Sequence, residues 1–375
     1  MIMLNGWKVP QGKTSQPASN LSARQFIVSL CDDDATEGAY PQDPGALDHP
    51  YQGGYYTRLH PVIVAANRYL LANNLIQQGE EIAPCECVYI NNRLSTNPAS
   101  SYYFERWYHL KCLQDLYGWE IANHTERHGS FIEALNDNSI AESDINGCRS
   151  KLVNDYGFQI DTLVYPYGYH SHLTRLKVAE QHKCGVCVGG TFAGVGNHNI
   201  PPINNYALSR KTIDLMSAAN ATGDIINPTA ALNLLKSYVD SAKNDNGWLI
   251  TMSHIGGYFW KNYNSLFIDP TYPSEWIIPC PKLPSDWQNS NNHVVPEGWY
   301  PYPNSLLDCL YKMIIYIYEQ GGKIVLPRDG VDIFGNISTE GDITWGVKGL
   351  GADSDSTNYE HIAKGVDGSI TAYRS

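Results

Sequence analysis

Short apolar runs and longer amphipathic segments alternate along most of this chain of 375 residues. The apolar runs that we interpret as strands are 25–31, 87–90, 119–122, 161–165, 184–188, 248–253 and 323–327. The segments with a helical pattern are 61–78, 103–117, 142–156, 172–182, 229–243 and 306–319. Repeated strand-helix alternation predicts a parallel sheet covered by helices, and the number of units favours a barrel over an open sheet.

The first apolar run ends abruptly in Asp32, Asp33 and Asp34. A buried strand that breaks into carboxylates places them at its carboxyl end, where α/β barrels build their sites. Three adjacent carboxylates repel one another, so we expect a cation, and a metal ion in particular, to compensate them. A solvated acidic turn is the alternative interpretation.

His124 and His128 follow another apolar run and are the only histidines of the chain that lie four positions apart. On a helical turn, residues with this spacing share a face, so both imidazoles can point at one ion. This is typical metal-ligand spacing. The alternative is a pair of histidines that do not bind a metal ion.

Two further strands end in residues that carry chemistry: the segment Thr162–Gly168 ends in Pro-Tyr-Gly, and Trp248–His254 ends in a lone histidine. With the acidic triplet and the histidine pair in this order, the chain resembles the polysaccharide deacetylases with NodB homology, carbohydrate esterase family 4, over residues 21–337. The resemblance implies an α/β fold, a distorted seven-stranded (β/α)7 barrel of the NodB type with long aromatic-rich loop insertions. Residues 1–20 then form a polar N-terminal arm, and 338–375 a C-terminal tail or small appended segment.

The resemblance also implies an activity, the removal of acetyl groups from an acetylated oligo- or polysaccharide by a metal-dependent hydrolase. Asp33, His124 and His128 match the metal ligands of the family. The expected cofactor is a divalent ion, zinc first, with cobalt, nickel or manganese as alternatives. An ion that keeps open positions both activates water and stabilises an oxyanion.

Three other residues match the groups that act on the substrate in the family. Asp32 matches the general base that takes a proton from the attacking water. The backbone N–H of Tyr167 matches the donor to the oxyanion, and His254 matches the general acid.

The chain departs from the family pattern in three places. Val164 stands where an arginine often pairs with the base, and we expect Arg210 to hold the base instead. Asp34 replaces a glycine, so a second register, with Asp33 as the base and Asp34 as the ligand, stays open. The fourth motif is weak, and Asp214 is the only carboxylate that we suggest for orienting His254.

Composition excludes some partners. The net charge is −12 with 26 Lys and Arg, whereas nucleic acids and anionic membranes require a basic face. No run of 18 apolar residues is present, so no membrane span is expected. No signal peptide is visible, which favours the cytoplasm by default, with an extracellular or particle-associated protein as the alternative. The sequence does not set the oligomeric state.

The nine cysteines are irregularly spaced and are interpreted as reduced thiols that pack in the core. A four-thiolate zinc site made of Cys85, Cys87, Cys184 and Cys187 is the alternative. Two other functions stay open as well. One is the hydrolysis of a non-sugar amide or imide on the same barrel, and the other is a non-catalytic glycan-binding module.

Overall fold

The computed structural model describes residues 25–33, 56–90, 110–111, 113–188, 198–200, 203, 205–213, 227–253, 306–334, 347–348, 359–364 and 370–374. The strands are β1 (Ile27–Asp32), β2 (Cys85–Val88), β3 (Glu120–Asn123), β4 (Thr162–Val164), β5 (Cys184–Val188), β6 (Leu208–Thr212), β7 (Trp248–Ser253), β8 (Lys323–Ile324), β9 (Val347–Lys348), β10 (Tyr359–Lys364) and β11 (Ile370–Arg374). The α-helices are α1 (Tyr56–Ala72), α3 (Asn138–Ala141), α4 (Cys148–Asn154), α5 (His172–Gln181), α6 (Pro228–Asn244), α8 (Leu306–Glu319) and α9 (Pro327–Phe334). The described part also contains two 3-10 helices, η2 (His128–Leu135) and η4 (Pro166–Gly168), one π-helical turn, η3 (Glu142–Gly147), and helical residues at 110–111 and 113–117.

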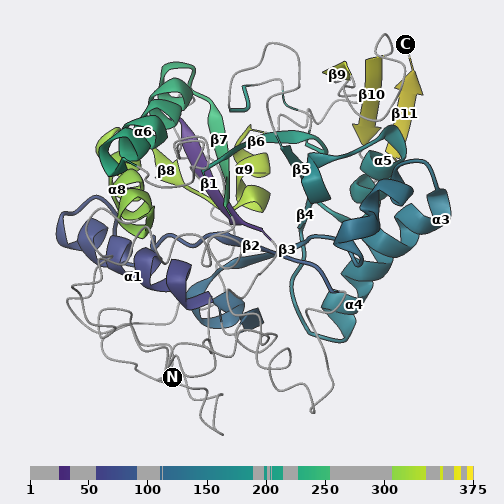
Figure 1. Cartoon of the computed structure of the whole chain (residues 1–375), viewed down its shortest axis with the longest axis horizontal. Helices are drawn as coiled ribbons and strands as arrows, with labels where there is room; N and C mark the ends of the chain where they lie inside the picture. The colour runs from purple at the N-terminus through teal and green to yellow at the C-terminus, as the bar shows by residue number, and fades with distance from the viewer. Residues whose placement is uncertain are drawn as a thin grey trace, which may run out of the picture.

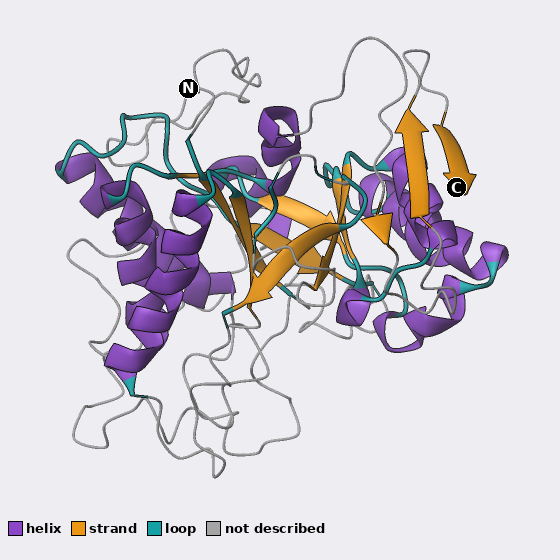
Figure 2. Cartoon of the chain, turned by 90° about the horizontal axis from the view of Figure 1, so that it is seen from above, coloured by secondary structure: helices purple, strands orange, loops and turns teal. Residues whose placement is uncertain are grey.

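Strands β1 to β7 form a closed parallel barrel. Each strand pairs with its neighbour in chain order, and β1 pairs with both β7 and β2, which closes the circle. The N-terminal half of β1 also pairs with β8, at Ile27 opposite Lys323, whereas its C-terminal half pairs with β2, at Cys31 opposite Cys85. Two strands therefore share one edge of β1, which distorts the circle. Figure 2 shows the strands at the centre with helices outside them, and the predicted α/β barrel is confirmed.

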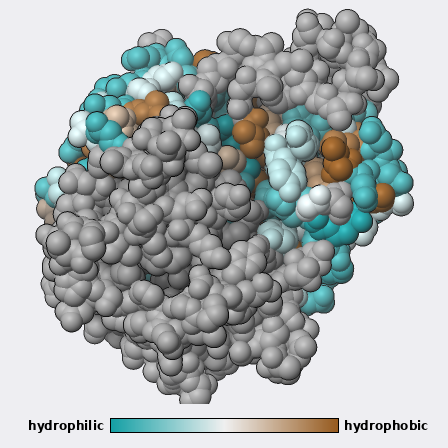
Figure 3. Space-filling view, in the orientation of Figure 1, coloured by the Kyte–Doolittle hydropathy of each residue, from teal (hydrophilic) through white to brown (hydrophobic). Residues whose placement is uncertain are grey.

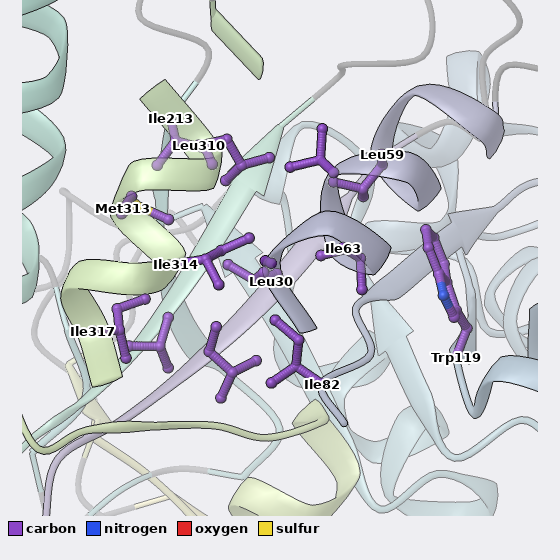
Figure 4. Close-up of a cluster of buried hydrophobic side chains, with 14 of the residues drawn as sticks. Leu30, Leu59, Ile63, Ile82, Trp119, Ile213, Leu310, Met313, Ile314 and Ile317 are labelled. Carbon is purple, nitrogen blue, oxygen red and sulfur yellow. The ribbon is translucent and has the colours of Figure 1, made fainter. Parts of the chain in front are cut away.

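Two groups of helices cover the barrel. In Figure 1, α1, α6 and α8 lie together on one side, and α3, α4 and α5 on the other. The larger apolar core lies under the first group, where Leu30 of β1 meets Ile63 of α1 and Ile314 of α8 (Figure 4). Fully burying one such side chain contributes roughly 1.5–3 kcal/mol to stability. The packing of these helices on the barrel is therefore the largest apolar contribution to the stability of the described part.

Helix α9 closes the N-terminal end of the barrel. Its Val331 and Phe334 belong to the same buried cluster as Ile27 and Trp248, which begin β1 and β7. The rings of Phe334 and Trp248 lie 6.1 Å apart. A Cβ on Gly330 would lie 2.3 Å from the Trp248 ring, so the helix can approach this closely only with glycine there. The sequence analysis continued a strand to residue 327 and missed this helix.

Residues 338–375, which the sequence left unassigned in structure, contain the antiparallel strands β9, β10 and β11. None of the helices in the described part combines the length and apolar character needed to cross a bilayer. In Figure 3, apolar residues form small separate patches among polar ones on the side where Figure 1 places α3, α4 and α5. The predicted aromatic-rich insertions lie mostly outside the described residues.

Candidate active site at the carboxyl end of the barrel

Asp33 points into the barrel, whereas Asp32 points outward. Side chains alternate along β1: Cys31 packs in the interior cluster and Leu30 in the outer one. Asp33 lies two positions after Cys31 and therefore faces the same side. Its backbone N–H donates to the carbonyl oxygen of Ser253 at 2.7 Å. Neighbouring carboxylates of the acidic triplet therefore face different surroundings.

Arg210 of β6 binds Asp33 through both oxygens. Nη1 donates to Oδ1 at 2.5 Å and Nη2 donates to Oδ2 at 2.6 Å, and both residues are buried. Burial alone would lower the pKa of Arg210, but the charge and the hydrogen bonds of Asp33 outweigh it and raise that pKa. Bidentate pairs of this kind are strong and fix the plane of the carboxylate. Arg210 reaches the acidic triplet as predicted, but its partner is Asp33 rather than Asp32.

Asp32 is held by β7. The Ser253 hydroxyl donates to its Oδ1 at 2.6 Å, and the two residues are partners in the β1–β7 register. Asp32 is also buried. This contact belongs to the outer face of the sheet, away from Arg210.

His124 follows β3 and points into the barrel, beside Asp33. Its Nδ1 lies 2.7 Å from the Val164 carbonyl oxygen. Because a carbonyl can only accept, Nδ1 carries the proton, and the neutral ring then has its lone pair on Nε2. Nε2 lies 3.9 Å from Oδ2 of Asp33. The backbone carbonyl of Val164 thus fixes the tautomer of His124.

His128 begins η2 and is half-buried. Its ring centroid lies 4.8 Å from that of His124 and 5.1 Å from that of Tyr89. The two histidines therefore meet, as their spacing predicts. Tyr89 was missed in the sequence, although its place directly after β2, at the carboxyl end of a strand, was a signal for it.

The donor set of this site fits a divalent ion. Two imidazoles, one with its lone pair directed toward a buried carboxylate, are ligands that zinc, cobalt and nickel accept. Within the residues that the structure describes, no three histidine, cysteine or acidic side chains are gathered closely enough to hold an ion by themselves. Asp34, Asp214 and His254, which the sequence analysis also named, lie outside those residues.

The Pro-Tyr-Gly turn is η4, and it brings Tyr167 to the histidines. Tyr167 has φ 55° and Gly168 has φ 74°, both in the left-handed region. A Cβ on Gly168 would lie 2.6 Å from the backbone nitrogen of Val188, so only glycine fits there. The Tyr167 ring is 58% exposed and its centroid lies 4.8 Å from that of His128.

The four cysteines of the alternative zinc site do not come together. Cys85, Cys87 and Cys184 point into the barrel. Cys187 packs outside it, with Tyr165, in a buried cluster separate from that of Leu30. Successive side chains of a strand alternate between its faces, and the odd spacing of Cys184 and Cys187 separates them. The four-thiolate interpretation is wrong, and these thiols pack in the core.

No protein-family model and no curated protein matches the sequence. Several solved structures are similar in fold. The Xyl-CE4 domain of a multidomain xylanase from the hindgut metagenome of Trinervitermes trinervoides has 12% identity and a TM-score of 0.39, over 83% of this chain and 92% of that one. A Streptococcus mutans CE4 esterase has 10% identity and a TM-score of 0.39, over 83% and 90%.

A family 4 acetyl xylan esterase from Clostridium thermocellum, solved with a cobalt ion, has 12% identity and a TM-score of 0.29, over 64% of this chain and 90% of that one. At such scores and identities, a likeness says nothing about which residues act. The chemistry of the site therefore rests on the geometry of this chain.

Proposed function

We propose that this chain is a metal-dependent hydrolase that removes N- or O-linked acetyl groups from an acetylated oligo- or polysaccharide. The observation that carries the proposal is the meeting of the Asp33–Arg210 pair with Nε2 of His124 at the carboxyl end of the barrel. There, a fixed carboxylate and an imidazole lone pair lie within 3.9 Å of each other. Such a pair can take a proton from water and hold a cation beside it.

His124 and His128, with one carboxylate of the acidic triplet, would hold the ion. A divalent ion at this place supplies a Lewis acid for the acetyl carbonyl and lowers the pKa of water. Zinc is the first expectation because imidazole nitrogen and carboxylate oxygen are its common ligands, and cobalt, nickel and manganese are alternatives.

Of the two registers, the contact with Arg210 favours Asp33 as the general base and Asp34 as the ligand. The guanidinium supplies a countercharge beside Asp33 and fixes its orientation, which suits a residue that takes a proton. Asp32 faces Ser253 on the outer side of the sheet. In the other register, Asp32 is the base and Asp33 the ligand.

Tyr167 and His254 complete the proposed chemistry. The left-handed backbone of Tyr167 is the kind of strained turn that persists where its N–H has a task, here to donate to the oxyanion. In the sequence, His254 directly follows β7, the strand that pairs with β1, and His254 would protonate the leaving group.

The exposed aromatic rings favour a carbohydrate over a small amide or imide. Tyr167 is 58% exposed and Tyr169 is 50% exposed, and their ring centroids lie 6.0 Å apart. Amphipathic rings that stay open to solvent beside His128 offer faces on which a sugar can stack. A small cyclic substrate would instead require a pocket that encloses it.

The test measures acetate released from acetylated chito-oligosaccharides and acetylated xylan, together with bound metal. The protein is stripped with a chelator and reloaded with zinc, for the wild type, His128→Ala and the control Asp115→Asn, whose carboxylate pairs with Lys111 on an exposed helix face. We expect about one zinc ion per chain and acetate release in the wild type and the control, and the loss of both in His128→Ala.

Two results would contradict the proposal. Bound zinc without acetate release would favour the non-sugar amide or imide, or, if glycan binding remained, a non-catalytic module. No bound metal in the wild type would mean that the histidine pair is structural.

A further inference from the structure

The loop between the two histidines is anchored to a π-helical turn. Residues 138–154 run through α3, η3 and α4 without a break, and the six residues of η3 form the wide turn. Such turns are rare and occur frequently at functional sites. This one supplies a side chain and two backbone carbonyls to the loop that carries His124 and His128.

The side-chain anchor is an ion pair between Arg127 and Asp144. Nε of Arg127 donates to Oδ1 at 2.9 Å, and Nη2 donates to Oδ2 at 3.1 Å. Asp144 is fully buried, whereas the Arg127 side chain is 36% exposed. Because both oxygens of a buried carboxylate are engaged, the guanidinium has one orientation, and Arg127 directly precedes His128.

The backbone anchors act on the other end of the loop. The Asp144 carbonyl accepts the N–H of Glu126 at 3.2 Å, and the Ile145 carbonyl accepts Nδ2 of Asn123 at 2.9 Å. Asn123 in turn accepts the N–H of Thr125 at 2.9 Å. The residues on both sides of His124 are therefore tied to η3 directly or through one side chain.

These ties hold a strained backbone. Thr125 has φ 69°, a conformation that β-branched residues avoid. Such strain costs roughly 1–3 kcal/mol and persists only where the surroundings impose it. Its presence indicates that the path from His124 to His128 is specified rather than incidental.

We propose that Asp144 is a positioning residue that, through Arg127, sets the place of His128 relative to His124 and thereby the affinity of the pair for a divalent ion. The inference rests on the proposed function, since it assumes that the histidines bind the ion. The Asp144 carboxylate is fully buried and binds Arg127, so it would act on the ion only through that residue. Partners that orient metal ligands typically change metal affinity by about 10–100-fold when they are removed.

The test measures the zinc affinity of the stripped protein by competition with a chelator of known affinity. Asp144→Asn keeps the size of the side chain and removes its charge, and Glu133→Gln is the matched control because Glu133 contacts the same guanidinium from the exposed side, at 3.5 Å. We expect zinc affinity to fall at least about 10-fold in Asp144→Asn and to stay within about twofold of the wild type in Glu133→Gln. The two-dimensional NMR signals of the His128 ring should shift in the first variant alone.

Arg127→Lys keeps the test decisive if Asp144→Asn does not fold. Arg127→Lys retains the positive charge but cannot make the bidentate contact with Asp144. Its zinc affinity should therefore lie between those of the wild type and Asp144→Asn. In folded proteins, Arg127→Gln combined with Asp144→Asn should lose no more affinity than either single variant, because both remove one interaction.

Unchanged zinc affinity in folded Asp144→Asn or Arg127→Lys would overturn the inference while leaving the proposed function intact. A wild type that binds no divalent ion would overturn both. The two failures are thus told apart by the wild-type measurement.

Discussion

Two carboxylates are buried inside the same barrel, at opposite ends and with different partners. At the carboxyl end, both oxygens of Asp33 accept from the guanidinium of Arg210. At the amino end, Glu120 accepts the Thr162 hydroxyl at 2.6 Å and the backbone N–H of Arg328 at 3.3 Å, and no cationic side chain in the described part of the chain hydrogen-bonds to it.

The difference separates the chemical role that we propose for Asp33 from a structural role of Glu120. Burial raises the pKa of Glu120 to about 7, even though Arg328 and Thr162 act in the opposite direction. Glu120 therefore holds its proton up to near neutrality and serves as an acceptor for the first turn of α9. Asp33 has a full countercharge that shares its burial, which keeps a carboxylate available where water and substrate would meet the barrel.

The largest expected effect follows from removing the countercharge. Arg210→Met removes the buried countercharge of Asp33, so we expect the free energy of unfolding to fall by roughly 3–5 kcal/mol and acetate release to be lost. Arg328→Met is the comparison at the other end, where the side chain is partly exposed and lies 3.7 Å from Asp161. It should cost less than about 1 kcal/mol. Urea denaturation of both variants checks this, and equal losses would mean that the two ends do not differ.

The second prediction concerns the pH dependence of stability. The folded pKa of Glu120 is about 7 and the ordinary value is 4.5, so the contribution of Glu120 to stability is complete below pH about 4.5. As the pH rises to about 7 the unfolded chain loses this proton first, and the free energy of unfolding falls by about 3 kcal/mol.

Glu120→Gln should remove this slope. The quantity to compare is the difference between wild type and variant in urea denaturation at several pH values, since other groups titrate equally in both. A constant difference across the window would contradict a raised pKa at Glu120.

A smaller effect distinguishes the glycines at the two ends. Gly168→Ala and Gly330→Ala each place a methyl group against fixed atoms, of Val188 and of Trp248 respectively, and should each cost roughly 1–3 kcal/mol. Only Gly168→Ala should also lower acetate release in the folded protein, because it moves Tyr167 at the site. Thermal denaturation and the acetate assay check the two variants. Equal losses of acetate release in both would contradict the expectation that only Gly168 affects the site.

The first and last residues of some elements were predicted correctly, because these elements are determined by the local sequence pattern. Strands β5 and β7 and helix α8 have the predicted bounds because each is a clean apolar pattern that ends in polar or turn residues. Helix α9 was missed because Pro327 was interpreted as the end of a strand, although proline is equally suited to the first turn of a helix. The π-helical turn η3 was missed because its residues have the same polar and apolar pattern as an ordinary α-helix.

The register of the acidic triplet could not be predicted for a physical reason. Alternation along β1 groups Cys31 with Asp33 and Leu30 with Asp32. Both faces of a parallel barrel strand are buried, so composition does not say which face is inside. The contact of Asp33 with Arg210 shows that Asp33 lies on the inner face, and the separation of the two residues by 177 positions hides this contact in the sequence.

The most direct test of the account replaces each member of the triplet in turn, with Asp32→Asn, Asp33→Asn and Asp34→Asn, and measures bound zinc and turnover in the folded proteins. We expect Asp33→Asn to keep its zinc but lose at least about 100-fold in turnover, as removal of a general base does. Asp34→Asn should lose zinc, and Asp32→Asn should stay within a few-fold of the wild type. Loss of zinc in Asp33→Asn, together with loss of turnover but not zinc in Asp32→Asn, would contradict the assignment of Asp33 as the base.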